Sequence, residues 1–279
     1  MKHLTISLLN IDEAILTIDV LDKLALLSDQ DWKIQLIMVD NGSRADQLQL
    51  LQDWFTSNKR RFEETLFVAA SRNLGATGGR NLAFKLSSND RILILDNDVI
   101  LPDEDVWLNR LWQGMEADPR VGIIGPMLVF ADYSEIVQAT GIGLSAQGRV
   151  GYLNRGQPVT KVPPVIMEVV ASPSACWLVR REAQQAVGFL SDEFYPVQYE
   201  DVDLCIRLSL SKWKILCDCS VRIKHIENIT TRNLKDHSFA RLTVRRGMRL
   251  KEKWADVLPE IANIAENDIY WGPIPRRET

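Results

Sequence analysis

Four short apolar runs alternate with segments of helical periodicity over the first hundred residues, and this alternation restricts the chain to a few folds. Each run is rich in leucine and β-branched residues and is bounded by polar residues, as buried strands are. Strands that alternate with helices predict βαβ units. We therefore expect an α/β fold with a Rossmann-like, mostly parallel sheet flanked by helices. The predicted strands span residues 4–9, 35–39, 65–70 and 91–95.

The segments between these strands predict helices. One spans residues 11–27, a second follows Ser43 as its N-cap, and a third runs through Leu86. A fourth helix is predicted over 103–115, with Val106 among its core-facing residues.

The alternation weakens after this helix. Residues 121–164 are rich in Gly and Pro and predict irregular strands and loops, whereas regular strands return over 165–170 and 175–179. No linker is long enough to separate two independent domains.

Composition and charge exclude several classes of protein. The formal net charge is −4, so no overall positive field exists to hold nucleic acid. No apolar stretch approaches the ~20 residues that span a bilayer, and the N-terminal apolar run is too short for a signal peptide. Cys217 and Cys219 lack the spacing and the second pair of a zinc site, so they indicate buried, reduced thiols. We expect a cytoplasmic protein.

Acidic residues follow the fourth predicted strand. Asp96 and Asp98 stand where this strand leaves the sheet, and in open α/β sheets ligands bind at the carboxyl ends of the strands. Two carboxylates one residue apart suit a hard divalent cation that shares oxygen ligands with a substrate phosphate. A solvated acid pair at a turn is the alternative for this motif taken alone.

Two other strand ends carry polar or glycine-rich motifs. Asp40 could accept a hydrogen bond from a base N–H or a ribose hydroxyl, although Asp-Asn-Gly-Ser is also a strong turn sequence. Gly75, Gly78 and Gly79 enter a helix whose N-terminus favours anions, and Arg80 adds positive charge. Close packing between helix and strand is the alternative for Gly78 and Gly79.

A second acidic cluster opens a later helix. Asp201 shares a face with Leu204 and is expected to point inward, while Asp203 turns partly away. A buried carboxylate near a metal–phosphate centre can act as a general base toward a hydroxyl, and acids in a first helical turn also favour the helix dipole. His225 becomes a metal ligand only if the fold brings it to Asp98.

Taken in order, these motifs resemble those of family 2 glycosyltransferases, which have the GT-A fold, over about residues 4–250. The matching segments are Val39-Asp40-Asn41-Gly42-Ser43, Asn73-Leu74-Gly75 with Gly79-Arg80-Asn81, Leu95-Asp96-Asn97-Asp98, Tyr199-Glu200-Asp201-Val202-Asp203-Leu204 with Arg207, and His225.

The resemblance implies a role for each matching residue. Asp98 and His225 would hold Mn²⁺ or Mg²⁺, and Asp201 would be the general base of an inverting displacement. Trp177 and Glu200 would lie on the acceptor side. The nucleotide would be bound by Asn10, Asp40, Asn73, Gly75, Gly79, Arg80 and Asp96, with Asp40 at the base.

The resemblance also implies substrates and an organisation. The donor would be a nucleoside diphosphate sugar, with UDP expected first and dTDP or GDP as alternatives. The acceptor would be a hydroxyl on a glycan or a lipid-linked sugar, in polysaccharide or cell-surface glycan synthesis. A GT-A domain over 1–225 would comprise a nucleotide-binding half (1–100) and an acceptor half (101–225) with a smaller mixed sheet. A helical extension over 226–279 would follow.

Four basic residues of this extension, Arg241, Arg245, Arg249 and Lys253, are spaced by four and would share one helix face. Such a face is typical of peripheral contact with a membrane or an anionic lipid-linked acceptor. A solvated charged face is the alternative.

Two other functions are compatible with the motifs. A catalytically inactive sugar-nucleotide-binding protein would bind the donor without turnover. A nucleotide-dependent oxidoreductase would use residues 75–79, but the glycine motif expected after its first strand is absent.

Overall fold

The computed structural model describes residues 1–27, 31–226 and 236–267. Within them, most strands belong to one large mixed sheet, and two form a small separate sheet. The strands of the large sheet are β1 (Lys2–Asn10), β2 (Trp32–Asp40), β3 (Glu64–Ala69), β4 (Arg91–Asp96), β5 (Val99–Ile100), β6 (Val121–Phe130), β7 (Val137–Ala139), β10 (Ile166–Glu168), β11 (Cys176–Arg180) and β12 (Lys214–His225). The small sheet pairs β8 (Ile142–Leu144) with β9 (Val150–Tyr152).

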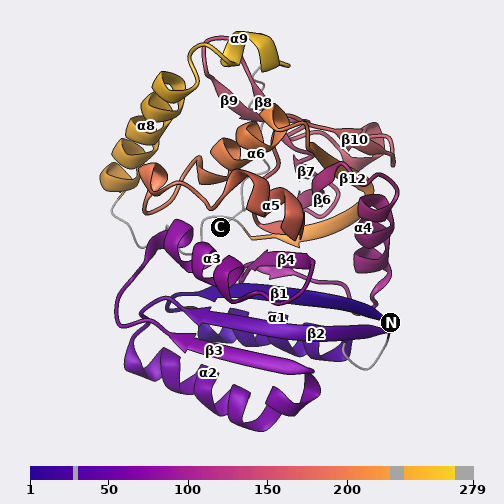
Figure 1. Cartoon of the computed structure of the whole chain (residues 1–279), viewed down its shortest axis with the longest axis vertical. Helices are drawn as coiled ribbons and strands as arrows, with labels where there is room; N and C mark the ends of the chain where they lie inside the picture. The colour runs from indigo at the N-terminus through magenta and orange to yellow at the C-terminus, as the bar shows by residue number, and fades with distance from the viewer. Residues whose placement is uncertain (28–30, 227–235, 268–279) are drawn as a thin grey trace.

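Helices cover both faces of the large sheet (Figure 1). Side chains from successive strand positions point to opposite faces, so each face has its own apolar core. One face packs against α1 (Ala14–Leu27), α2 (Ala45–Asn58) and α4 (Val106–Glu116). The other packs against α3 (Gly75–Leu86), α5 (Arg181–Val187) and α6 (Glu200–Leu210). The C-terminal helices α8 (Asp236–Lys253) and α9 (Leu258–Ile261) add Leu250 and Leu258 to this second core.

The strand order explains where a ligand can bind. The sheet runs β10-β12-β6-β11-β4-β1-β2-β3, and β1 pairs in parallel with both β2 and β4. The chain therefore progresses to one side from β1 to β3 and crosses to the other side at β4. Asn10 pairs with Asp40, and Leu9 pairs with Asp96, so polar strand ends meet at one edge. Such a switch point forms a crevice at the carboxyl ends of the strands.

The expected α/β fold is confirmed, and the first four strands lie within three residues of their predicted bounds. Residues 121–164, however, are not simply irregular, because β6 is a ten-residue strand whose residues are all buried. Glycine and Pro126 within this strand masked its apolar character. The predicted extension over 226–279 includes residues 227–235 and 268–279, which lie outside the described residues.

Three helix starts also differ from their predicted positions. Helix α1 begins at Ala14 rather than at residue 11, because Asp12 has a left-handed φ of 57° that an α-helix cannot include. Ser43 does not cap α2: its hydroxyl donates to Asp40 Oδ1, and Arg44 is the N-cap residue. Helix α4 starts at Val106, which is exposed rather than core-facing. Among the described residues, no helix combines the length and apolarity needed to cross a membrane.

Gly75 fixes the start of α3 against the loop that precedes α6. Its φ is +70°, and a Cβ there would lie 2.5 Å from the carbonyl oxygen of Pro196. We predict that Gly75→Ala lowers the free energy of unfolding by about 2–4 kcal/mol, from left-handed backbone strain plus this contact. Urea-induced unfolding measures the change.

Gly188 provides a comparison without a steric contact. Its φ is +82° and a Cβ there would meet nothing within 4 Å, but its ψ of −163° lies in a region that essentially only glycine adopts. Gly188→Ala should therefore cost backbone strain alone, about 1–3 kcal/mol. A loss below about 2 kcal/mol in Gly75→Ala would show that the contact with Pro196 contributes nothing.

Candidate active site

A cavity of about 680 Å³ opens at the switch point between β1 and β4. Its walls come from strand ends, from the start of α3 and from the start of α6, so segments distant in sequence converge there. Most of the residues predicted for the site line this cavity. They are Asn10, Asn73, Gly75, Arg80, Asp96, Asp98, Glu200, Asp201 and His225.

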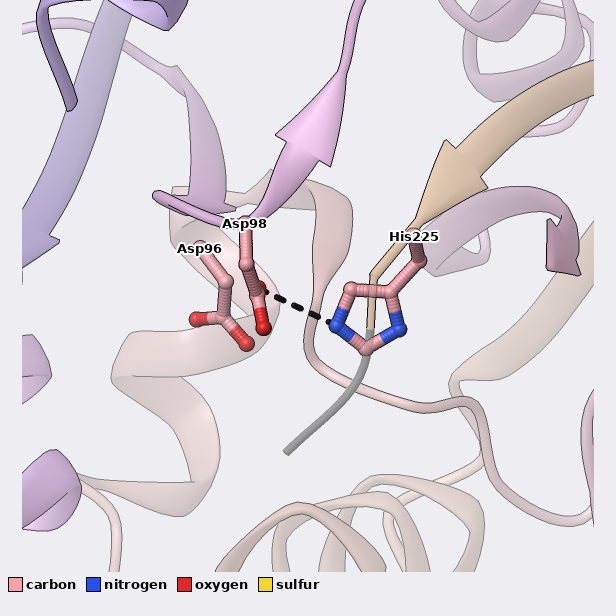
Figure 2. A group of neighbouring side chains, drawn as sticks. All are labelled: Asp96, Asp98 and His225. Carbon is pink, nitrogen blue, oxygen red and sulfur yellow. Dashed lines mark hydrogen bonds and ion pairs between the residues drawn. The ribbon is translucent and has the colours of Figure 1, made fainter. Parts of the chain in front are cut away.

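Asp96, Asp98 and His225 form a group that could hold a metal ion. Figure 2 shows the carboxylate of Asp96 at the end of β4, that of Asp98 just before β5, and the imidazole at the end of β12. One ligand atom from each residue lies within 4.8 Å of the others, and His225 Nε2 is 3.1 Å from Asp98 Oδ1. The antiparallel pair β5–β12 places Val99 opposite His225 and so brings the imidazole to Asp98.

Gln138, on β7, orients the imidazole, and the sequence analysis missed it. Its Oε1 lies 2.8 Å from His225 Nδ1. With the Gln138 amide in this orientation, its oxygen accepts from an Nδ1–H of His225. Nε2 and Asp98 Oδ1 then face each other as acceptors, an arrangement that a proton or a divalent cation satisfies. Carboxylate oxygens and imidazole nitrogen suit Mn²⁺, and a hydrogen bond to the second ring nitrogen is usual for a histidine ligand. The residues therefore fit a divalent metal.

Arg80 connects the two sides of the cavity. Its guanidinium is 6% exposed, with one nitrogen 2.6 Å from Asp96 Oδ1 and another 2.9 Å from Glu200 Oε1. Arg80 was expected beside the diphosphate. It lines the cavity, but two carboxylates already pair with its guanidinium. Glu200 likewise faces Arg80 and is buried, whereas it was expected on the acceptor side.

Three carboxylates surround this single guanidinium. Burial, and next the Asp201 carboxylate, raise the pKa of Glu200 to about 7, against the opposing effect of Arg80. Burial also raises the pKa of Asp201. Glu200 Oε2 is buried and has no hydrogen-bond partner among the described residues. A buried carboxylate oxygen without a partner favours the protonated form, in agreement with the raised pKa of Glu200. A raised pKa brings a carboxylate closer to the value that general-base catalysis favours.

Two acids at the start of α6, Asp201 and Asp203, have different surroundings. Asp201 lines the cavity, as expected. Asp203 does not turn away to solvent but is fully buried. It accepts hydrogen bonds from Arg207 Nε (2.9 Å), Lys253 Nζ (2.8 Å) and Trp254 Nε1 (3.1 Å). Asp203 therefore ties α6 to the C-terminal helices, which the helical pattern of α6 alone could not reveal.

Two residues predicted to bind the nucleotide, Asp40 and Gly79, lie behind the cavity wall instead of lining the cavity. Asp40 is fully buried and accepts from Asn10 Nδ2 (2.9 Å) and Ser43 Oγ (2.5 Å), so it holds a turn rather than lining the cavity. Gly79 packs α3 against β1, because a Cβ there would collide with Leu9 Cδ1. Both residues fill the structural role that the sequence also allowed, and their contact with a nucleotide stays a prediction.

Two further expectations need correction. Trp177 is 1% exposed and lies in the core rather than in the cavity wall, so the structure does not place it at an acceptor. The N–H of Ala76 at the start of α3 donates to the carbonyl of Pro196 at 2.7 Å. That donor therefore holds a protein loop instead of pointing at a phosphate. Asn41, which was not singled out, lines the cavity and donates to Asn73 Oδ1 at 3.1 Å.

Comparison with known proteins gives a family match and two relatives that are much longer than this chain. The family profile Glycosyl transferase family 2 matches residues 19–183. The O-antigen biosynthesis protein RfbC of Myxococcus xanthus is 26% identical over 210 residues, which are 71% of this chain and 15% of RfbC. The uncharacterized protein y4gI of Sinorhizobium fredii is 25% identical over 228 residues, 79% of this chain and 24% of y4gI.

Solved structures share the fold at low sequence identity. GalNAc-T7, solved with UDP, GalNAc and Mn²⁺, has a TM-score of 0.68 and 13% identity, over 91% of this chain and 49% of that one. The mannosyltransferase PcManGT of Pyrobaculum calidifontis, solved with GDP-Man and Mn²⁺, has a TM-score of 0.59 and 15% identity, over 91% and 64% of the two chains. At this identity the likeness shows the fold.

We predict that Asp98→Asn weakens Mn²⁺ binding at least 100-fold, since it removes a charged ligand. Gln138→Leu should weaken it by about 10–100-fold, the usual effect of losing the partner that orients a histidine ligand. Titration followed by Mn²⁺ electron paramagnetic resonance measures both. Asp53→Asn, at an exposed position on α2, is the control. Wild-type affinity in Asp98→Asn would exclude this metal site.

The raised pKa of Glu200 predicts a pH dependence of stability. The folded protein binds the proton more tightly than the unfolded chain, so the contribution of Glu200 to stability falls as pH rises from about 5 to 8. The loss is at most about 3 kcal/mol. Urea unfolding in EDTA should show that Glu200→Gln is stabilised relative to wild type as pH rises. The exposed Glu182→Gln should follow wild type, and parallel curves for all three proteins would refute the shift.

Proposed function

The chain belongs to glycosyl transferase family 2, and on that premise we propose that it moves a sugar from a nucleoside diphosphate sugar to an acceptor hydroxyl, with inversion at the anomeric carbon. One observation carries the proposal. A group of residues suited to a divalent metal and the Asp201 carboxylate line the same cavity, at the carboxyl ends of the strands. This arrangement offers separate places for a leaving diphosphate and for an attacking hydroxyl.

On the donor side, Asp98 and His225 would hold Mn²⁺ or Mg²⁺, with Asp96 beside them. The cation, when bound, supplies stabilisation of the negative charge that develops on the departing diphosphate. Asn73 is exposed at the cavity and can bond to a nucleoside, whereas the amides of Asn10 and Asn41 are buried in the cavity wall and already bonded to protein groups. Because related folds are solved with UDP and with GDP-Man, these two nucleotides are the first donors to test.

On the acceptor side, Asp201 would remove the proton from the attacking hydroxyl. The new bond joins the hydroxyl oxygen to the anomeric carbon while the bond from that carbon to the phosphate oxygen breaks, and the proton passes to a carboxylate oxygen of Asp201. Burial raises the pKa of Asp201 and so favours proton uptake. Arg80, through Glu200 and Asp96, keeps the start of α6 in place opposite the metal-binding residues.

The remaining cavity wall suits a sugar acceptor. Ile142, Val150 and Tyr152 provide an apolar surface from the β8–β9 sheet. The Arg155 guanidinium lies 5.2 Å from the centre of the Tyr152 ring and so helps to orient it. The similarity to RfbC, whose name refers to O-antigen biosynthesis, supports a cell-surface glycan as acceptor.

We predict that Asp201→Asn retains nucleotide binding but lowers transfer at least 100-fold, because an amide cannot accept the proton. Binding is followed by thermal shift with UDP or GDP and Mn²⁺, and transfer by release of the nucleoside diphosphate with glycan acceptors. Asp192→Asn, at an exposed position in the segment that precedes α6, is the control. Transfer at wild-type rates in Asp201→Asn would place the base elsewhere. Nucleotide binding without turnover in the wild type, on every acceptor tested, would favour a binding protein.

A further inference from the structure

Two parallel ridges run along the outer face of α8. Ala240, Val244 and Met248 form an apolar ridge, in which Val244 is 64% exposed and Met248 59% exposed. Arginines follow each of these positions and form the second ridge, Arg241, Arg245 and Arg249. Large apolar side chains held in water beside arginines are typical of a surface that binds a partner.

The basic residues of α8 divide into two groups that the sequence pattern did not separate. Lys253 pairs with Asp203 and Glu193, and Arg249 pairs with Glu193, so this end of the predicted basic face is bound to the protein. Arg241 and Arg245 are exposed and make no ion pair with any other described residue. Their charge is therefore available to a partner.

The inner face of α8 fixes the helix beside the active-site cavity. Arg246 donates to the carbonyl of Glu193 at 2.6 Å, and Leu250 is fully buried. Thr243, the neighbour of Val244, lines the cavity itself. In Figure 1, α8 lies along the outer edge of the molecule beside α6. A surface that contacts the outer ridges would thus lie close to the cavity.

We propose that the outer face of α8 binds an anionic lipid bilayer. Val244 and Met248 enter the boundary between headgroups and acyl chains, while Arg241 and Arg245 contact lipid phosphates. An apolar ridge flanked by arginines that pair with no other described residue fits a flat anionic surface, whereas the net charge of −4 would not attract one. Given the proposed function, this contact would bring the cavity to an acceptor carried by a membrane lipid.

Sedimentation of the full chain with vesicles tests the proposal. Wild type should bind vesicles of phosphatidylcholine with 30% phosphatidylglycerol at least tenfold more tightly than pure phosphatidylcholine, and salt should weaken this binding. Arg241→Ser with Arg245→Ser should reduce binding by about 10–30-fold. Val244→Ser with Met248→Ser should reduce it on the same vesicles by at least fivefold, because less apolar area is buried.

Arg60→Ser with Arg61→Ser is the control for the loss of two positive charges. These two arginines are exposed and lie just before β3. No binding by wild type, or equal losses in the control pair and the Arg241–Arg245 pair, would overturn the proposal. Nucleotide thermal shifts should be unchanged in the α8 variants. Vesicle binding without any nucleotide shift in the wild type would support the surface and refute the transferase instead.

Discussion

The buried Arg80 guanidinium is the interaction on which the rest of the site depends. It lies on α3 and bonds to Asp96 at the end of β4 and to Glu200 at the start of α6. Removing one partner of a buried ion pair typically costs about 3–5 kcal/mol, because the remaining charge is left uncompensated. The cation therefore does more than add positive charge to the cavity. It connects the strand end that carries the candidate metal ligands with the helix that carries Asp201.

Two other contacts complete this geometry from the opposite side. Pairing of β5 with β12 brings His225 to Asp98 across 127 residues of sequence, and Gln138 orients the ring. Asp203 connects α6 to the C-terminal helices through Lys253. The candidate metal ligands, the proposed base and the proposed membrane face of α8 consequently belong to one connected set of contacts.

The residues that were predicted well share a physical property. A buried strand followed by acids is recognisable locally, and all parallel strands of a βαβ unit end at the same edge of the sheet. Asp96 and Asp98 could therefore be placed in one crevice from the sequence, whereas Asn10 followed from the resemblance, and Asp40, placed there by the same argument, lies behind the cavity wall. The strand β6 was missed, because internal glycines and a proline hide the apolar pattern when its neighbours β11 and β12 are unknown.

The sequence by itself determined the α/β class, the edge of the sheet at which the candidate site lies, and the order of acidic and glycine motifs, because these follow from local periodicity. Only the tertiary structure decided how each polar group is used. Asp40 holds a turn and Gly79 permits close packing, whereas Gln138 reaches His225. The same carboxylate, glycine or amide suits a ligand or a neighbouring segment equally well, and distance and burial in the folded chain select between them.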